Sequence, residues 1–372
     1  MTIPPPGTPR SGLARRLLGM ALLAGLAGCA SSGPCESPFA GSPQFDGAAC
    51  KFRNADAVDV RATSSVVSIW FRMFFAKPDT TVPVDPLPVR DLDRATLDAL
   101  DPAAVHVVRL GHSSHLLKLR GRYWLIDPVF GARASPVSFA GPKRFHRSPL
   151  ALAAVPPIEG LVLSHDHYDH LDTETIRALL DRVERYFVPL GLKARLTAQG
   201  VPAERIVELD WWQTAEHGTV SLVATPAQHF SGRTLWDRDS TLWASWVIVQ
   251  GGTRIFYSGD SGFHAGFRAI GERLGPFDVG LMENGAYNPV DWPRTHMTPE
   301  QTLQAARDVR ARLLFGVHNS TFDLAFHPWK EPMERLSDLA ERAAFPYASP
   351  VPGEVLTLGR ERRNERWWQG LR

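Results

Sequence analysis

This chain of 372 residues shows little compositional imbalance. It has 41 Lys and Arg against 39 Asp and Glu, a formal net charge of +2. It also lacks a basic stripe with interleaved aromatic residues, so we expect no nucleic-acid partner. Cysteine is scarce, with three residues in all, and none lies near the histidine-rich motif described below, so we expect no thiolate ligands. No repeat of solenoid period is visible. The length suffices for one large domain with extensions.

The first residues have the pattern of a targeting segment. Arg10, Arg15 and Arg16 precede the apolar stretch Leu17–Ala27, which leads into Gly-Cys29. A basic region, a short apolar region and small residues before a cleavage point are typical of a secretory signal. The apolar stretch is shorter than the ~20 residues of a membrane span, although a short transmembrane anchor is the alternative. The pattern resembles a bacterial lipoprotein signal, which implies removal of residues 1–28 and lipidation of Cys29.

Lipidation would place the protein in the bacterial cell envelope. Ala30 stands where an Asp often retains such proteins at the inner membrane, which favours the outer membrane, facing the periplasm. In that oxidising compartment two interpretations of Cys35 and Cys50 remain open, a small loop-closing disulfide and two free thiols. Ser31–Gly47 is rich in Ser, Pro and Gly and predicts a linker. We assign residues 29–100 to this linker and an N-terminal extension.

Within that extension, Ser65–Ala76 is strongly apolar and predicts a helix. Two interpretations remain open for it. The helix either touches lipid and guides acyl chains, or packs across the main domain. Packing is the commoner fate of an apolar helical stripe.

One motif dominates the chain. The apolar run from Leu161 predicts a buried strand and leads into His165-Asp-His167-Tyr-Asp169-His170. Three imidazoles and two carboxylates in six residues are too many for an apolar core, but they suit a metal site. In extended chain, residues two apart point the same way, so His165 and His167 can reach one metal. Asp169 and His170 follow as the chain turns and can reach a second.

Two metals need further ligands. Three candidates stand at the ends of predicted strands: His229, Asp260 and His318. Gly259 lets the backbone approach closely beside Asp260, and a carboxylate there can bridge two ions. We therefore expect one metal on His165, His167 and His229, and another on Asp169, His170 and His318, with Asp260 shared.

Stretches around these ligands carry a resemblance that covers about residues 100–330. They are Leu110–Ser113, Ile126–Phe130, Arg133–Pro136, Gly141–Phe145, Ser164–Asp172, Trp211–Gln213, Gln228–Ser231, Leu242–Trp246, Gly285–Pro289 and His318–Phe322. The chain resembles the metallo-β-lactamase superfamily, and within it the N-acylphosphatidylethanolamine-hydrolysing phospholipase D-like branch. Two positions depart from that branch: Ser113–His115 is less apolar than expected, and Asp166 stands where Asn is common.

The resemblance implies an α/β fold, an αββα sandwich of two mixed sheets flanked by helices, over residues 101–372. The order of apolar runs fits this fold but does not single it out. Strands are predicted at Val105–Leu110, Leu116–Leu119, Tyr123–Ile126, Gly160–Leu163, Arg185–Val188, Ile206–Leu209, Thr219–Thr225, Leu242–Val249, Thr253–Ser258, Val279–Met282 and Arg312–Val317. Helices are predicted at Leu92–Leu100, Thr173–Val183, Pro299–Val309 and Lys330–Ala344, with Asp172 as a cap and Thr298 opening a capping box.

Histidine and carboxylate ligands suit two zinc ions best, with Fe or Mn also possible. Two such cations lower the pKa of a shared water from ~15.7 toward ~7 and make it a nucleophile. Asp127 is a candidate to accept an N–H from a ligating histidine, or else a turn residue. His296 is a candidate acid or phosphate contact by resemblance. His112 and Asp166 are weaker candidates for the same supporting work.

For a phosphodiester substrate, Lys143, Arg144 and Arg233 are candidate phosphate contacts, although charged residues are mostly solvated. The chain has 11 Trp, and two interpretations apply to four of them. They line an apolar pocket for acyl chains or, for at least half, pack in the core. These are Trp211, Trp212, Trp243 and Trp246.

We expect a lipid-anchored, metal-dependent hydrolase that cleaves a phosphodiester in a phospholipid, such as an N-acylated phosphatidylethanolamine. The first alternative keeps the fold and metals but acts on another bond, a lactone or other ester. The second is a non-catalytic envelope lipoprotein whose metals only hold the fold. The complete ligand set with Asp260 argues against that second alternative. The sequence does not determine the oligomeric state.

Overall fold

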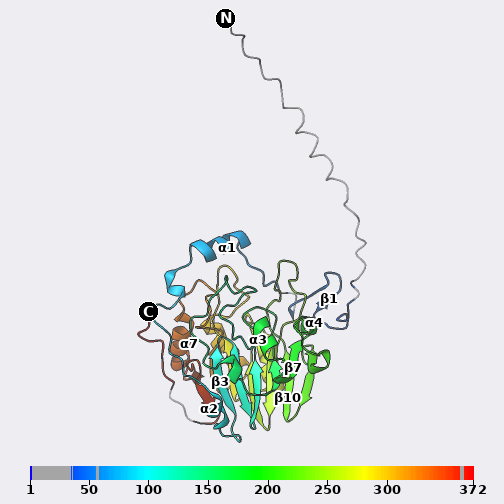
Figure 1. Cartoon of the computed structure of the whole chain (residues 1–372), viewed down its shortest axis with the longest axis vertical. Helices are drawn as coiled ribbons and strands as arrows, with labels where there is room; N and C mark the ends of the chain where they lie inside the picture. The colour runs from blue at the N-terminus through cyan, green and yellow to red at the C-terminus, as the bar shows by residue number, and fades with distance from the viewer. Residues whose placement is uncertain (2–34, 36, 56–57, 361–363) are drawn as a thin grey trace.

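Two seven-stranded sheets form the centre of the fold (Figure 1). The computed structural model describes residues 1, 35, 37–55, 58–360 and 364–372. The predicted signal and Cys29 lie outside the described residues. The first sheet runs in the order β16 (Val355–Thr357), β3 (His106–Gly111), β4 (Ser114–Leu119), β5 (Arg122–Ile126), β6 (Ile158–Val162), β7 (Val183–Pro189) and β8 (Ile206–Leu209).

The second sheet has the same size. Its order is β15 (Tyr347–Ala348), β14 (Leu314–Val317), β13 (Val279–Glu283), β12 (Thr253–Tyr257), β11 (Ser245–Gln250), β10 (Val220–Thr225) and β9 (Thr214–His217). Both sheets are mixed: β5 to β8 and β12 to β15 pair in parallel, and the other pairs are antiparallel.

Helices cover the outer face of each sheet. The first sheet carries α2 (Arg94–Asp98), α3 (Thr173–Ala178) and α4 (Leu192–Thr197), and the second carries α5 (Gly266–Leu274), α6 (Pro299–Asp308) and α7 (Glu331–Arg342). Short 3₁₀ turns occur at Asp79–Thr81, Leu152–Ala154 and Ala203–Arg205. This is the αββα sandwich that the family resemblance implies. The additional helix α1 (Val66–Phe75) lies at one end of the molecule, away from the outer helices (Figure 1).

Alternation along the strands produces three apolar layers. On β5, Trp124 and Ile126 pack between the sheets while Leu125 packs under the helices of the first sheet. On β12, Tyr257 faces the inner layer and Phe256 the helices of the second sheet. The two-residue period of a strand thus serves two cores at once, which is why these runs are apolar without interruption.

Most predicted elements are present, with shifted ends. The capping box that opens α6 forms between Thr298 and Gln301, and Asp172 caps α3 by accepting from the backbone N–H of Glu174 at 3.2 Å. The prediction that α3 reaches Val183 is wrong, because Val183 begins β7. The sequence analysis missed α4, α5, β1 (Phe45–Asp46), β2 (Lys51–Phe52), β9, β15 and β16. All of these except α5 have six residues or fewer, which leaves little periodicity to detect.

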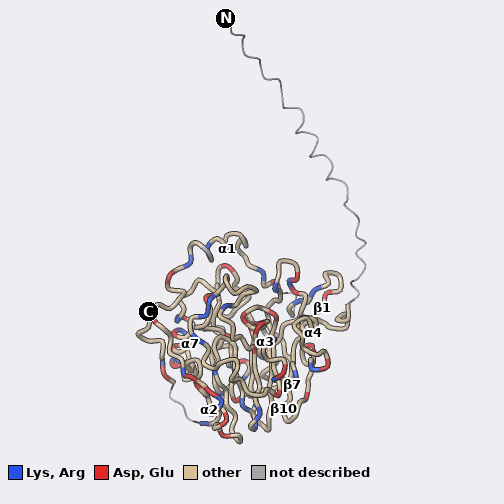
Figure 2. Tube along the Cα trace, in the orientation of Figure 1, with Lys and Arg blue, Asp and Glu red and all other residues tan. Residues whose placement is uncertain are grey.

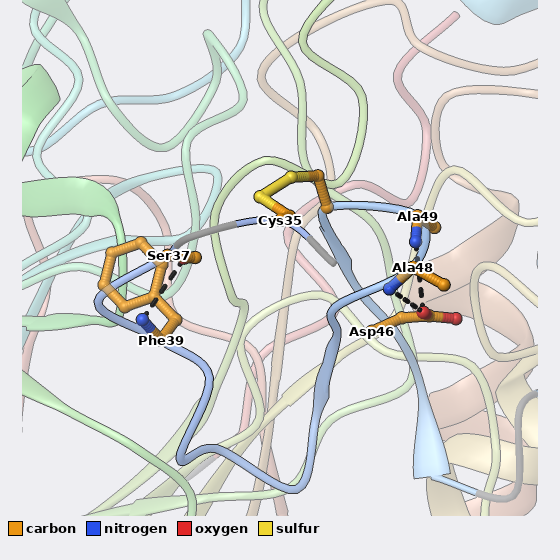
Figure 3. The surroundings of a disulfide bond; sticks show 7 residues. Cys35, Ser37, Phe39, Asp46, Ala48 and Ala49 are labelled. Carbon is orange, nitrogen blue, oxygen red and sulfur yellow. Dashed lines mark hydrogen bonds between the residues drawn. A yellow bond between two sulfur atoms is a disulfide. The ribbon is translucent and has the colours of Figure 1, made fainter. Parts of the chain in front are cut away.

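The N-terminal extension packs on the domain instead of forming a loose spacer. Cys35 and Cys50 form a disulfide, the first of the two open interpretations, beside a hairpin of β1 and β2 (Figure 3). In the turn of the hairpin, the carboxylate of Asp46 accepts from two backbone N–H groups. Phe52 joins the layer between the sheets. The linker prediction for Ser31–Gly47 is therefore wrong for its described part, because aromatic side chains there find a core to enter.

Sequence alone assigns four tryptophans either to an apolar substrate pocket or to the core, and the structure places them in the core. Trp211, Trp243 and Trp246 lie in the layer between the sheets, and Trp212 packs against it. None of the four lines the pocket described below. Charges of both signs are scattered over the chain (Figure 2). Within the described residues, no helix has the length and apolar character that crossing a membrane requires.

Candidate metal centre

The candidate ligands gather where strands of both sheets end. Asp127 directly follows β5, His165 follows β6, and His229 follows β10. Asp260 follows β12 and His318 directly follows β14. Because parallel strands end at the same edge of a sheet, residues far apart in sequence meet there, as is general for sites in α/β folds.

The first group consists of His165, His167 and His229. Nδ1 of His167 lies 2.8 Å from Nε2 of His165 and 3.3 Å from Nε2 of His229. Burial holds the pKa of all three below the usual range, aided at His165 and His229 by neighbouring histidines. Three neutral imidazoles thus direct ring nitrogens at one point, where a cation satisfies all of them and a single proton cannot.

The second group consists of Asp169, His170 and His318. Oδ2 of Asp169 lies 3.3 Å from Nε2 of His318 and 3.5 Å from Nε2 of His170. Burial alone would lower the pKa of His318, but Asp260 and Asp169 raise it to about 10. The pKa of His170 is likewise raised, against burial, by these two carboxylates. The positive imidazoles of His170 and His318 are therefore balanced by the carboxylates of Asp169 and Asp260. A bound cation would supply the same positive charge.

Asp260 lies between the two groups. Its Oδ2 is 2.9 Å from Nε2 of His318 and 3.1 Å from Nε2 of His170. It is also 3.8 Å from Nε2 of both His165 and His229. One carboxylate oxygen therefore reaches both groups, which is the placement of a bridging ligand.

Gly259 makes the position of Asp260 possible. It has a φ of 57°, and a Cβ there would lie 2.8 Å from Cβ of Ser164 and 2.9 Å from the carbonyl oxygen of Ala244. Any side chain would push β12 away from the loop that carries His165. The close approach expected from the sequence is thus present.

The donor set fits divalent cations. Oδ1 of Asp260 is buried without a hydrogen-bond partner, and buried polar atoms in folded proteins nearly always have one. Groups of histidine and carboxylate donor atoms lie within 4.8 Å of one another, and they include all seven expected ligands. Nitrogen and oxygen donors without thiolate suit zinc and also accept iron or manganese.

Asp127 supports the centre through hydrogen bonds that its carboxylate accepts. Its Oδ2 accepts the Nδ1–H of His170 at 2.7 Å and the hydroxyl of Tyr257 at 2.5 Å, and its Oδ1 accepts the backbone N–H of Ser164 at 2.7 Å. The hydrogen bond fixes the tautomer of His170, so that Nε2 faces the cluster. Asp127 is therefore a positioning residue, with the geometry expected from the sequence.

The two weaker candidates differ. His112 is buried, and burial lowers its pKa to about 3, with His318 adding to the effect. The neutral ring places Nε2 at 2.9 Å from Oδ2 of Asp169 and orients that carboxylate. Asp166 does not join the cluster: it accepts from the backbone N–H of Gly232 at 2.8 Å and pairs with Arg195 at 2.8 Å. It fastens the loop after His229 instead.

Two supporting residues escaped the sequence analysis. Glu283, at the end of β13, accepts from Nδ1 of His296 at 2.8 Å, and burial raises its pKa although His296 opposes the shift. A carboxylate after an apolar strand is the signal that pointed to Asp260, and it also applies to Glu283. Asn54 bonds both the backbone N–H and C=O of His229 at 2.9 Å. No local pattern identifies Asn54, because its partner is 175 residues away.

A pocket of about 730 Å³ opens beside the cluster. His296 lies on its wall, and its two cations are Arg61 and Arg238. The phosphate contacts proposed from the sequence do not line this pocket. They are Lys143, which is exposed; Arg144, which donates to the carbonyls of Val129 and Gly131; and Arg233, which donates to the carbonyls of Asp166 and Leu171. The apolar part of the wall consists of Val60, Ile69, Phe230, Ala286, Trp292 and Leu324.

Comparison with known proteins agrees with this geometry. The family described as Beta-lactamase superfamily domain matches residues 122–319. An uncharacterized protein of Mycobacterium tuberculosis is 45% identical over 72% of this chain and 73% of its own. N-acyl-phosphatidylethanolamine-hydrolyzing phospholipase D 1 of Caenorhabditis elegans is 34% identical over 71% of this chain and 75% of its own. Igni18, a metallo hydrolase of Ignicoccus hospitalis, shares the fold, with a TM-score of 0.53 at 20% identity over 70% of this chain and 100% of its own.

Proposed function

Since this chain belongs to the β-lactamase superfamily domain family and is a hydrolase of the metallo-β-lactamase fold, we propose that it is a phosphodiesterase. In this proposal it holds two divalent cations, preferably zinc, and hydrolyses a phospholipid such as an N-acylated phosphatidylethanolamine. The observation that supports it most strongly is the placement of Asp260 between two groups of three ligands.

Cations bound there would acidify water for attack and stabilise negative charge on the phosphate. Other residues of the chain would position the ligands and exchange a proton. Asp127 holds His170 in one tautomer, and His112 holds the carboxylate of Asp169. Glu283 accepts the Nδ1–H of His296, which leaves Nε2 of His296 available to exchange a proton with the leaving group.

The pocket supports an amphiphilic substrate. Arg238 stacks 4.2 Å above the ring of Phe230 and pairs through Nε with Asp239 at 3.4 Å, so its guanidinium is held at the wall. A guanidinium has five N–H donors, and those beyond Nε would bind the phosphate in this proposal. Ile69, Trp292 and Leu324 offer apolar surface to acyl chains. The phospholipase relative in Caenorhabditis elegans supports the same substrate class. A lactone or other small ester would use the cluster but neither of these features.

The test is hydrolysis by purified protein of residues 31–372, which retain every described residue except Met1. Bis-p-nitrophenyl phosphate and N-acylphosphatidylethanolamine are supplied in parallel, with metal content measured on the same sample. We expect about two metal ions per chain, from the seven-ligand set. We also expect release of phosphatidic acid from the lipid.

Asp260→Ala should abolish both reactions, whereas the exposed Asp181→Ala is the matched control and should leave them unchanged. Cleavage of the generic ester alone would keep the chemistry and remove the phospholipid. A metal-free protein without turnover would contradict the proposal as a whole.

A further inference from the structure

The side chain of Asn54 holds the backbone of the candidate ligand His229. The backbone N–H of His229 donates to Oδ1 of Asn54, and Nδ2 of Asn54 donates to the carbonyl of His229, both at 2.9 Å. The same amide accepts from Nε1 of Trp243 at 3.1 Å and donates to the carbonyl of Val58 at 3.4 Å. A side-chain amide has two acceptor positions and two N–H donors. Asn54 is therefore fully paired, and only one orientation of its amide satisfies all four partner atoms.

The ring of His229 is fixed from the same part of the chain. Nδ1 of His229 lies 3.3 Å from the carbonyl oxygen of Thr295, and the hydroxyl of Thr295 donates to the carbonyl of Val60 at 2.9 Å. Because a carbonyl can only accept, Nδ1 carries the proton and Nε2 is left for a cation. Asn54 thus fixes the backbone of this ligand, and Val60 supports its ring through Thr295.

This support is specific to one of the two metal groups. Within the described part of residues 35–60, the hydrogen bonds that reach a candidate ligand directly are those between Asn54 and His229. The second group is oriented by other residues, as His170 is by Asp127. A change at Asn54 should therefore act on the first group and spare the second.

The two-residue period of extended chain brings Asn54 into this position. Phe52 and Asn54 are buried, whereas Lys51, Arg53 and Ala55 are exposed. Successive side chains of a strand point to opposite sides. Phe52 enters the layer between the two sheets, and Asn54 follows it inward to reach His229. Burial of the phenyl ring therefore also sets the position of the amide.

A disulfide closes the loop that presents this strand. Cys35 and Cys50 lie 15 positions apart in the sequence, and Figure 3 shows their bond beside the hairpin. The backbone N–H of Cys35 also donates to the carbonyl of Gly47 at 2.9 Å. Cys50 precedes Asn54 by four residues, which span at most ~14 Å. A cross-link removes conformations that an open loop would sample, so the disulfide restrains the strand that carries Asn54.

We propose that the hairpin closed by Cys35 and Cys50 is a clamp for the first metal group, and that Asn54 is the positioning residue through which it acts on His229. The clamp sets the affinity of the first group for a cation and leaves the affinity of the second group unchanged. The statement about affinity rests on the two-metal centre of the proposed function, whereas the clamp itself can be measured in metal-free protein.

The test measures zinc affinity of residues 31–372 by competition with a chromogenic chelator. Asp169→Ala, which removes a ligand of the second group only, assigns the two binding constants to their groups. Asn54→Ala should weaken zinc binding by the first group about 10- to 100-fold, because His229 loses its support. Cys35→Ser/Cys50→Ser should weaken the same group about threefold or more, because Asn54 remains on a less restrained hairpin.

A measurement without metal separates positioning from a general loss of stability. In metal-free Asn54→Ala, hydrogen–deuterium exchange around His229 should be about tenfold faster, because its backbone N–H loses the acceptor. The matched control is Asn364→Ala. Oδ1 of Asn364 accepts from the backbone N–H of Ser349 at 3.0 Å, just after β15 at the edge of the second sheet farther from β10. The control should change neither this exchange nor the two zinc affinities.

If Asn54→Ala does not fold, Thr295→Val is the milder variant. It removes the hydroxyl that donates to the carbonyl of Val60, and it should weaken the first group in the same direction. Wild-type zinc affinity of the first group in the folded variants would overturn the proposal, as would a loss shared equally by both groups. The expected affinities without phosphodiester hydrolysis would leave the clamp intact and contradict the proposed function. Hydrolysis with unchanged affinities in the variants would contradict the clamp alone.

Discussion

The metal-binding cluster and α1 border the same pocket, but the fold supports them differently. Every candidate ligand of the cluster is buried or nearly so, and some are oriented by other groups, as His170 is by Asp127 and Asp169 is by His112. Helix α1 is fixed on one face by Arg72 and leaves Val67 and Phe71 in solvent. Buried polar groups must be satisfied from inside the protein, whereas exposed apolar groups need something outside it to cover them. The polar groups of the first region are paired within the protein or aimed at one another, whereas the second region leaves apolar side chains in solvent.

Removal of the metals should have the largest effect, and it should act through the cluster and not through α1. Dialysis against dipicolinate should lower phosphodiesterase activity by about 10³-fold or more. It should also lower the unfolding temperature, because ions that bind only the folded chain stabilise it. Activity and the unfolding temperature, each measured with and without added zinc, check this. Full activity of the metal-free protein would show that the cluster is not the catalytic centre.

Asp127→Asn should break the support of the cluster without removing a ligand. The amide cannot accept from His170 and Tyr257 as the carboxylate does, so one metal should bind about 10- to 100-fold more weakly. Competition with a chromogenic chelator measures the affinity of each site. Tyr257→Phe is the milder partner, because it removes one donor to the same carboxylate. If Asp127→Asn bound metal as tightly as the wild type, Asp127 would be a turn residue without a role in metal binding.

Acid should lower the free energy of unfolding, because it protonates histidines that the fold buries. Burial lowers the pKa of His115 to about 3, against about 6.5 when unfolded. Between these values the unfolded chain binds one proton more, so His115 makes stability fall as the pH drops below about 6.5. The loss should reach about 2 kcal/mol by pH 5. His115→Leu should remove this part of the slope in denaturant unfolding at pH 7.5 and pH 5. Parallel slopes would contradict the assignment.

Arg238→Gln should give the smallest effect, on the pocket between the two regions. We expect KM for the phospholipid to rise about tenfold with kcat nearly unchanged, because an ion pair to the phosphate is lost in binding. Lys143→Gln removes an exposed cation outside the pocket and is the control. If Lys143→Gln raised KM instead, Lys143 would be the phosphate contact, as proposed from the sequence, and the assignment of Arg238 would be wrong.

The members of the cluster were predictable from the sequence because the pattern that marks each of them is local. His165 and His167 are two residues apart in a segment that follows an apolar strand, and that spacing alone places both rings on one side. His229, Asp260 and His318 each follow a strand, and strand ends meet at one edge. The same rule would have found Glu283. The departure at His115 lies in the core against Phe315 and outside the pocket lining, so it bears on stability more than on substrate.

What the sequence determined by itself is which residue types could form the centre and that each follows an apolar strand, because both depend on patterns within a few residues. The tertiary structure alone decided which cations reach the pocket, how Asn54 holds the loop of His229, and which apolar side chains remain exposed. Those outcomes depend on contacts between segments far apart in the chain. Arg238 reaches the pocket and Arg233, five residues earlier, does not, because neighbouring residues of a turn point different ways. No local pattern records which of them the fold turns inward.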